Sequence, residues 1–182
     1  RLVGSEMCIR DSVCIAPGDV STVRHTHFVG LAAPNGAGWA LPGAVTFYEA
    51  PVQLEDVVFR DSRSEDAINI MRTEFRMTRA TFDGTQSDAF DGDFVSGAVI
   101  DSVFVDTGND AVDVSGSTLT LRRVTMLGVG DKAISAGEGS TIEADGIRVS
   151  EAEIGMASKD RSTIEARDVS FENCRLGFTA FQ

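Results

Sequence analysis

The chain has 182 residues and a formal net charge of −12. This acidity excludes a nucleic-acid-binding protein, because a phosphate backbone would be repelled. No apolar run is long enough to cross a bilayer, which excludes membrane insertion by a helix. Binding of a polyanionic polymer would need calcium or local Lys and Arg side chains to offset the charge.

The first part of the chain divides into two expected segments. Residues 1–12 are similar to a translated sequencing adapter and are expected to be artefactual. Residues 13–43 are expected to form an N-terminal β coil or cap. They contain His25 and His27, which strand alternation would place on one face. Two imidazoles without a third ligand predict surface histidines rather than a metal site.

From residue 44 onward the chain repeats a pattern of about 22 residues. One small residue recurs in each row and is followed by an apolar residue: Ala44, Ala67, Ala89, Ala111, Ala133, Gly155 and Gly177. A fixed period in the low twenties is typical of a solenoid, in which each coil buries its apolar face only against its neighbours. The leucine-rich repeat, a solenoid of similar period, is excluded because its leucine pattern is missing.

Each row also carries an alternation of apolar residues with one skip. This signature ends at Phe59, Phe82, Phe104, Met126, Val149 and Phe171. Alternation with a skip predicts a strand, a bend and a second strand, and the apolar residues after each small residue predict a third strand. Turn-forming residues fill the gaps. The rows therefore predict an all-β solenoid with the Phe side chains stacked in its core.

These rows resemble the right-handed parallel β-helix of the pectate-lyase-like superfamily over residues 44–182. The resemblance implies a single-stranded right-handed parallel β-helix and polysaccharide as the partner. Segments from Ser87 onward also resemble β-helix segments of large bacterial cell-envelope proteins, which implies an extracellular or cell-envelope location. The chain stops at Gln182 in mid-coil without a polar cap, which predicts a fragment of a longer protein with additional domains.

Acidic side chains gather on the strand that follows each small residue. With Phe90 and Gly92 facing inward, Asp91 and Asp93 are expected to face outward. Adjacent coils lie roughly 4.8 Å apart, so Asp91 and its counterpart one coil further on should be near neighbours. We name this side of the strand column the acid face, and its members are Asp66, Asn69, Asp88, Asp91, Asp93, Asp110 and Asp113.

Such a cluster needs neutralisation, because two carboxylates about 5 Å apart repel by roughly 3 kcal/mol at an effective dielectric near 20. Three hypotheses follow. Calcium, the expected cofactor, would be bound by Asp91, Asp93 and Asp113. Alternatively, a carboxylic acid and a carboxylate would act as an acid and base pair. In the third hypothesis, the aspartates of the bend (Asp66, Asp88 and Asp110) and Asn109 only cap backbone amides.

The expected catalytic residues are Asp88, Asp91, Asp110, Asp113, Lys132 and Lys159. Either lysine could be the base of a lyase, although a salt bridge to the aspartates is the simpler expectation. The resemblance to calcium-dependent pectate lyases implies an arginine base instead, for which Arg72, Arg122 and Arg123 are candidates. Asn69 and Tyr48 are expected to contact substrate, and the Tyr48 ring would stack on a sugar.

The chain lacks the Gly-His-Gly and Arg-Ile-Lys elements of polygalacturonase-type enzymes and the Asp-Pro-His-Asp signature of mannuronan epimerases. Catalytic roles therefore cannot be transferred from either family. The sequence predicts a domain that binds polysaccharide or acts on it, and an enzyme would be a polysaccharide lyase or glycoside hydrolase. The alternative is a structural or adhesive cell-envelope module without catalysis, stiffened by calcium.

Overall fold

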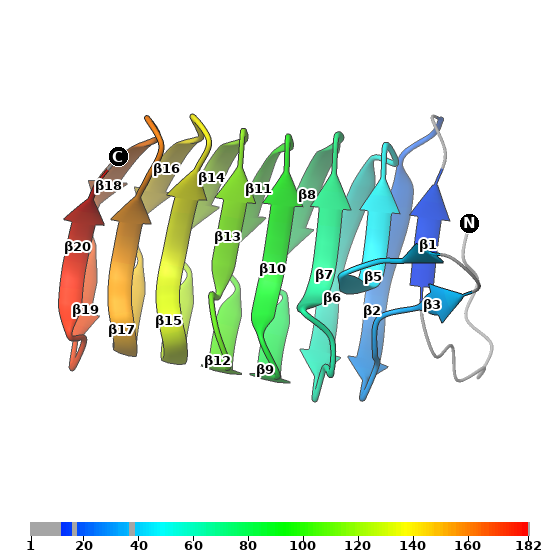
Figure 1. Cartoon of the computed structure of the whole chain (residues 1–182), viewed down its shortest axis with the longest axis horizontal. Coiled ribbons are helices and arrows are strands. Elements are labelled where there is room, and N and C mark those ends of the chain that lie inside the picture. The colour runs from blue at the N-terminus through cyan, green and yellow to red at the C-terminus, as the bar shows by residue number, and fades with distance from the viewer. Residues whose placement is uncertain (1–11, 16–17, 37–38, 182) are drawn as a thin grey trace.

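The computed structural model describes residues 12–15, 18–36 and 39–181, which form a parallel β-solenoid. Figure 1 shows the chain rising along one sheet, crossing at the top, descending behind and returning to start the next coil. This path winds in a right-handed sense and makes about 6 turns of about 22 residues. The predicted right-handed parallel β-helix is thereby confirmed. Residues 1–11 of the expected adapter-derived segment lie outside the described residues.

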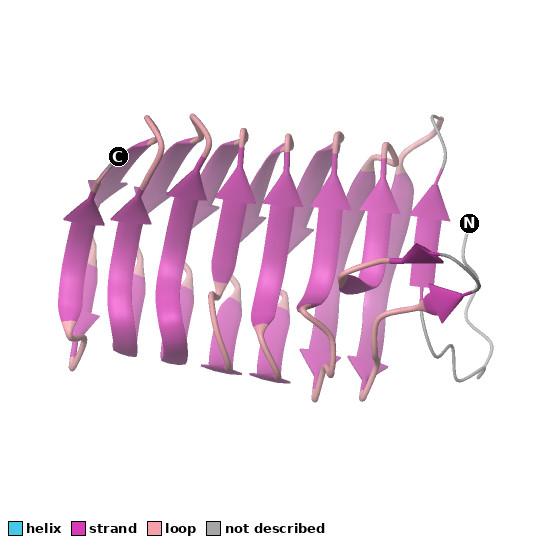
Figure 2. Ribbon diagram, in the orientation of Figure 1, coloured by secondary structure: helices cyan, strands magenta, loops and turns pink. Residues whose placement is uncertain are grey.

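The described part of the chain contains strands and loops but no helix (Figure 2). It accordingly has no helix long and apolar enough to cross a membrane. The front sheet of Figure 1 contains β1 (Ser12–Ile15), β5 (Gly43–Tyr48), β7 (Asp66–Met71), β10 (Asp88–Asp93), β13 (Val112–Ser115), the second parts of β15 (Thr125–Gly137) and β17 (Arg148–Ser158), and β20 (Leu176–Ala180).

The other strands of each coil form the remaining faces. Parallel pairing joins one row through β2 (Ser21–Val29), β6 (Val52–Arg60), β8 (Glu74–Thr78), β11 (Ser96–Ile100), β14 (Thr118–Arg122), β16 (Thr141–Asp145) and β18 (Thr163–Arg167). A second row includes β9 (Thr81–Thr85), β12 (Val103–Thr107), the first parts of β15 and β17, and β19 (Ser170–Glu172). The short β3 (Asn35–Gly36) and β4 (Trp39–Ala40) pair antiparallel.

Left-handed residues turn the chain from one face to the next. In the coil that begins with β10, these are Phe94, Asp101 and Asp106, with φ of 53°, 52° and 52°. A residue in this conformation reverses the inward and outward alternation, which explains the skip in the sequence pattern. The side chains at these positions project outward, and most are charged or are replaced by glycine.

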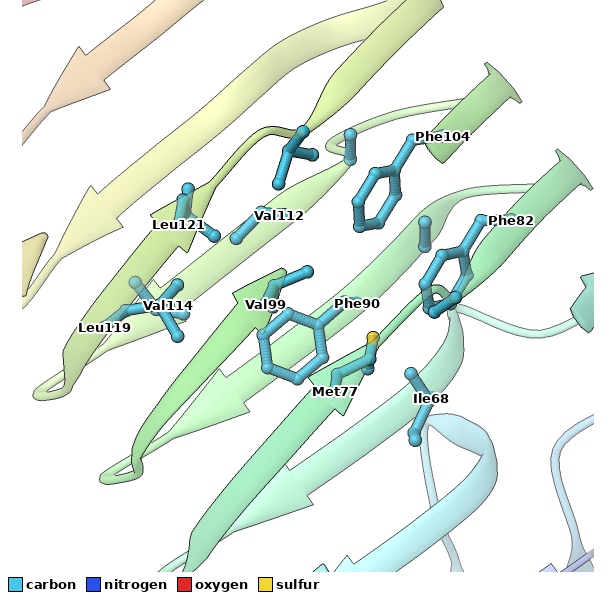
Figure 3. Close-up of a cluster of buried hydrophobic side chains, with 14 of the residues drawn as sticks. Ile68, Met77, Phe82, Phe90, Val99, Phe104, Val112, Val114, Leu119 and Leu121 are labelled. Atoms are coloured by element: carbon cyan, nitrogen blue, oxygen red, sulfur yellow. The ribbon is translucent and has the colours of Figure 1, made fainter. Parts of the chain in front are cut away.

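The core contains the expected aromatic stack. Ring centroids of Phe28 and Phe59, of Phe59 and Phe82, and of Phe82 and Phe104 lie 4.8, 4.8 and 4.6 Å apart. Figure 3 shows Phe82 and Phe104 side by side, next to aliphatic side chains from neighbouring coils. The expectation that Phe171 also lies within the core is wrong, because its side chain is 36% exposed in the last coil.

The column of small residues fits the inner corner of each coil. Ala89 and Phe90 are adjacent in sequence and both fully buried, so two consecutive side chains point inward. The corner at Ala89 has space for little more than a methyl group. At Gly155 even this space is filled, because an added Cβ would lie 2.3 Å from the Phe171 ring.

Coils already stack before residue 44. β1 pairs in parallel with β5, and β2 pairs with β6. Within β2, His25 adopts a φ of 49° and breaks the alternation that would have aligned it with His27. The His25 Nδ1 atom lies 3.6 Å from the Asp56 carboxylate, and both histidines are exposed. They are surface histidines, as the sequence predicts.

Candidate functional site

The acid face lies on the outer side of β7, β10 and β13. Strand register places Asn69 opposite Asp91, and Asp91 opposite Asp113. Asp66 lies opposite Asp88 in the same sheet. The 22-residue repeat therefore brings together the mid-strand side chains that the sequence pattern selected, on three consecutive coils.

Not all of these side chains face solvent. Asn69 is 0% exposed, so the expectation that this column presents it to a ligand is wrong. Ser135, further along the same column, is also 0% exposed, and Asp66 and Asp110 are each 2% exposed. The chain at the start of β5 bends over Asn69, since an added Cβ on Gly43 would lie only 2.8 Å from the Asn69 Cβ. Asp91 and Asp113 remain partly exposed. A soluble ligand can reach these two carboxyl groups but cannot touch Asn69 directly.

Asn69 instead orients Asp91. Its Nδ2 atom donates a hydrogen bond of 2.6 Å to Asp91 Oδ2. This bond crosses from one coil to the next and fixes the carboxyl group in mid-strand, where Asp is normally depleted. Asn69 is a positioning residue in this arrangement, and the expectation that it contacts substrate has no support from its burial.

Asp88 and Asp110 form a ladder of hydrogen bonds, in which each carboxylate accepts from a backbone N–H group of the next coil. The backbone N–H of Asp110 donates to Asp88 Oδ1 at 2.9 Å, and the backbone N–H of Lys132 donates to Asp110 Oδ1 at 2.8 Å. Asn109 Nδ2 adds a bond of 2.7 Å to Asp88 Oδ1. The capping hypothesis is thus confirmed for these two aspartates, whereas Asn109 bonds a carboxylate rather than a backbone amide.

Asp66 differs from the other members of the bend. It is 2% exposed, and neither its Oδ2 atom nor Asn69 Oδ1 has a hydrogen-bond partner among the described residues. Burial, reinforced by the negative charges of Asp91 and Asp88, raises the pKa of Asp66 to about 8. Asp66 is therefore largely a neutral carboxylic acid at pH 7, which reduces the charge repulsion within the cluster.

Asp91 has a proton affinity suited to acid and base chemistry. Burial raises its pKa to about 7, with further contributions from the charges of Asp93 and Asp113 and an opposing effect of the Asn69 hydrogen bond. Burial also raises the pKa of Asp110 to about 6, against the hydrogen bond and charge of Lys132. At neutral pH Asp91 can both give and accept a proton.

Lys132 is held in ion pairs. Its Nζ atom lies 3.5 Å from Asp110 Oδ1 and also contacts the Asp131 carboxylate. Burial alone would lower the Lys132 pKa, but the hydrogen bond to Asp131 and the nearby negative charges raise it above its ordinary value. The expected salt bridge is confirmed for Lys132, and a lysine that retains its proton is a poor general base.

Lys159 and Tyr48 lie further from the central carboxyl groups. Lys159 lies three coils beyond Asp93 along the same column, and the described residues give it no ion pair. Tyr48 lies in register with Met71, which is in register with Asp93, so two coils separate the tyrosine from that aspartate. The structure places both side chains on the expected face but does not bring either to Asp91.

The described residues do not form a ready-made calcium site. No group of three or more His, Cys, Asp or Glu side chains with metal-binding geometry occurs among the described residues. Asp91 and Asp113 are adjacent, but Asp93 lies two residues further along its strand. The oxygen-only donor set nevertheless suits a hard cation such as calcium, so calcium binding by these three aspartates stays a prediction.

No family model and no curated protein matches the chain. The site must therefore be interpreted from its own geometry. Two hollows of about 550 and 240 Å³ lie away from the acid face, the larger beside Glu138 and Asp160 and the smaller beside Glu55 and Arg76. The acid face is an open sheet surface rather than a lining of either hollow.

Sequence reasoning missed Phe94 at the edge of this surface and considered the neighbouring Arg72 only as a possible base of a lyase. Phe94 follows Asp93 directly at the end of β10 and is 51% exposed, and the Arg72 guanidinium carbon lies 5.1 Å from the centre of its ring. One signal could have revealed Phe94. In the repeat, Phe94 occupies the column of Glu49, Arg72, Gly116 and Glu138, where an aromatic residue is out of pattern.

Proposed function

We propose that the acid face binds a polysaccharide and hydrolyses it, with Asp91 as the proton donor and acceptor. The observation that carries this proposal is a partly exposed mid-strand carboxyl group with a pKa of about 7, in register with the carboxyl group of Asp113. Glycoside hydrolases use a pair of carboxyl groups that flank the glycosidic bond. Membership of the pectate-lyase-like superfamily is part of the proposal.

The spacing favours one type of hydrolysis. Strands in register are about 4.8 Å apart, close to the carboxyl separation of roughly 5 Å found in retaining enzymes. Protonated Asp91 would donate its proton to the glycosidic oxygen while the Asp113 carboxylate bonds to the anomeric carbon as the leaving group departs. Asp91 would then take a proton from the water that releases the sugar from Asp113. Asn69 would keep Asp91 oriented in both steps.

A lyase mechanism has less support. It requires a base that removes a carbon-bound proton, and the sequence offered Lys132 and Lys159 for this role, with Arg72, Arg122 and Arg123 as alternatives. The ion pairs of Lys132 keep it protonated, and Lys159 lies three coils from Asp93. The open surface also fits a polymer better than a small substrate, which would need an enclosing pocket.

The test uses the full chain incubated with a panel of polyuronates and neutral glycans, with and without calcium. We expect shortened oligosaccharides by mass spectrometry, with one added water per cut and no unsaturated ends. Asp91→Asn and Asp113→Asn should abolish cleavage, whereas Glu74→Gln, at an exposed position at the start of β8, should not. Products with unsaturated ends would replace hydrolysis by elimination. Intact glycans with folded wild-type protein would refute catalysis.

A structural or adhesive module is the second candidate. It is favoured by the Asp88 and Asp110 ladder, because both carboxylates stabilise the stacking of coils and leave fewer groups for catalysis. In this proposal calcium bound by Asp91, Asp93 and Asp113 would offset the charge of the acid face and stiffen the solenoid. Both candidates fit an extracellular or cell-envelope location with additional domains, and intact glycans that still bind would favour this one.

A further inference from the structure

Phe94 has a left-handed backbone conformation that bulky apolar residues normally avoid. Among the described residues, sixteen non-glycine residues have a positive φ, and Phe94, at φ 53°, is the only apolar one of them. A bulky residue in this conformation is strained. The ring gains little burial in return, since about half of its surface stays in water. Packing in the core therefore does not explain an aromatic residue here.

The neighbouring coils hold the ring in place. On one side the Arg72 guanidinium lies 5.1 Å from the ring centre, a cation–π contact. On the other side is Gly116, where an added Cβ would lie 2.7 Å from the ring atoms Cδ1 and Cε1. The ring thus lies across the position that a side chain of residue 116 would occupy. A preoriented, half-exposed ring presents apolar surface at low entropic cost on binding.

The ring lies at the edge of the acid face. Asp93 precedes it directly, and Asp91 is three residues away along β10, about 10 Å in an extended strand. Arg72 is exposed and forms no ion pair among the described residues, so its guanidinium donors remain available. The half of the Phe94 side chain that Arg72 and Gly116 leave exposed is apolar surface beside free N–H donors. This combination matches a pyranose, which has an apolar C–H face and a rim of hydroxyl groups.

The geometry points to a sugar-stacking subsite formed by Phe94 and Arg72, which holds one pyranose ring of a glycan whose neighbouring residues cross Asp91. This inference rests on the proposed function, because it assumes that the acid face carries the glycan. It adds the position of a subsite and the direction of the polymer, along β10 from Asp91 towards the bend.

The test is isothermal titration calorimetry of the full chain with the oligosaccharides that the wild-type protein binds in the glycan panel, in an Asp91→Asn background that prevents turnover. Phe94→Leu keeps apolar bulk and removes the ring, so we expect an affinity loss of about tenfold or more. Phe94→Trp should retain the affinity. Phe181→Ala, which removes a 52% exposed ring from the last coil, should have no effect.

The outcomes separate the two proposals. Tight binding by both wild type and Phe94→Leu would overturn the subsite and leave the proposed function standing. Equal losses for Phe94→Leu and Phe94→Trp would also overturn it, because they would indicate a local packing effect instead of stacking. If the wild-type protein binds no glycan, the proposed function fails and the subsite fails with it. Arg72→Gln should weaken binding less than the loss of the ring, and a circular dichroism spectrum for each variant confirms folding.

Discussion

Asp66 should make the protein less stable as pH rises. The group is buried, and its pKa of about 8 compares with an ordinary value of 3.8. Above pH 4 the unfolded chain releases this proton while the native protein retains it up to pH 8. The free energy of unfolding therefore falls across this interval, because the native state binds more protons.

The magnitude follows from the shift. About four pKa units at roughly 1.4 kcal/mol each amount to about 6 kcal/mol for the complete titration. Only about three of these units fall between about pH 4.5 and about pH 8, and relaxation with water entry reduces such burial costs, so we expect a loss of roughly 2–4 kcal/mol over this interval. Asp66→Asn keeps the shape of the neutral acid without its charge. This variant should match the wild type within about 1 kcal/mol at pH 4.5 and exceed it by several kcal/mol at pH 8.

Urea denaturation followed by circular dichroism, repeated across this pH range, measures the effect. Asp91 titrates in the same direction with a pKa of about 7, so a smaller slope should persist in Asp66→Asn up to that pH. Glu74→Gln, at an exposed position of β8, is the control and should follow the wild-type curve. A wild-type stability that is flat or rises between pH 5 and pH 8 would refute the argument, as would an Asp66→Asn variant that is destabilised at pH 8.

Three further predictions concern the core, the backbone and the cation. Phe82→Ala removes the middle of the ring stack and should cost about 3–5 kcal/mol in urea denaturation, and a loss below 1 kcal/mol would contradict a packed core. Gly108→Ala should cost about 1–3 kcal/mol in the same assay, because its Cβ would lie 2.2 Å from the Gln86 carbonyl oxygen; an unchanged midpoint would show that the backbone yields freely. Calcium should raise the melting temperature of the wild type but not of the Asp91→Ala, Asp113→Ala double variant, and an equal rise in both would place the ion elsewhere.

Much of the fold could be predicted because each coil has to meet the same packing requirements. The column of Ala89 and its counterparts reflects a corner with room for a methyl group, and the Phe59, Phe82 and Phe104 column reflects a stack of rings at the coil spacing. Phe171 breaks this rule, because the last coil has a neighbour on only one side among the described residues.

The candidate site was only partly predictable. The period of 22 residues fixed which side chains are neighbours, so the juxtaposition of Asp91 with Asp113 follows from counting. Burial does not follow from counting. Alternation assigned Asn69 to the outside, but the chain bends over it at Gly43, and the amide becomes a buried hydrogen-bond donor to Asp91.

The sequence by itself determined the solenoid, its coil length and the column in which each residue stands, because these depend on a period that the chain displays directly. Only the tertiary structure decided which acids are charged, which cap a backbone amide and which side chains a ligand can reach. Those properties depend on desolvation and on contacts between coils, and they differ between Asp66, Asp88 and Asp91 although the local sequences of the three are similarly acidic. The same holds for Phe94, whose exposure and contact with Arg72 arise from the path of the chain at one bend.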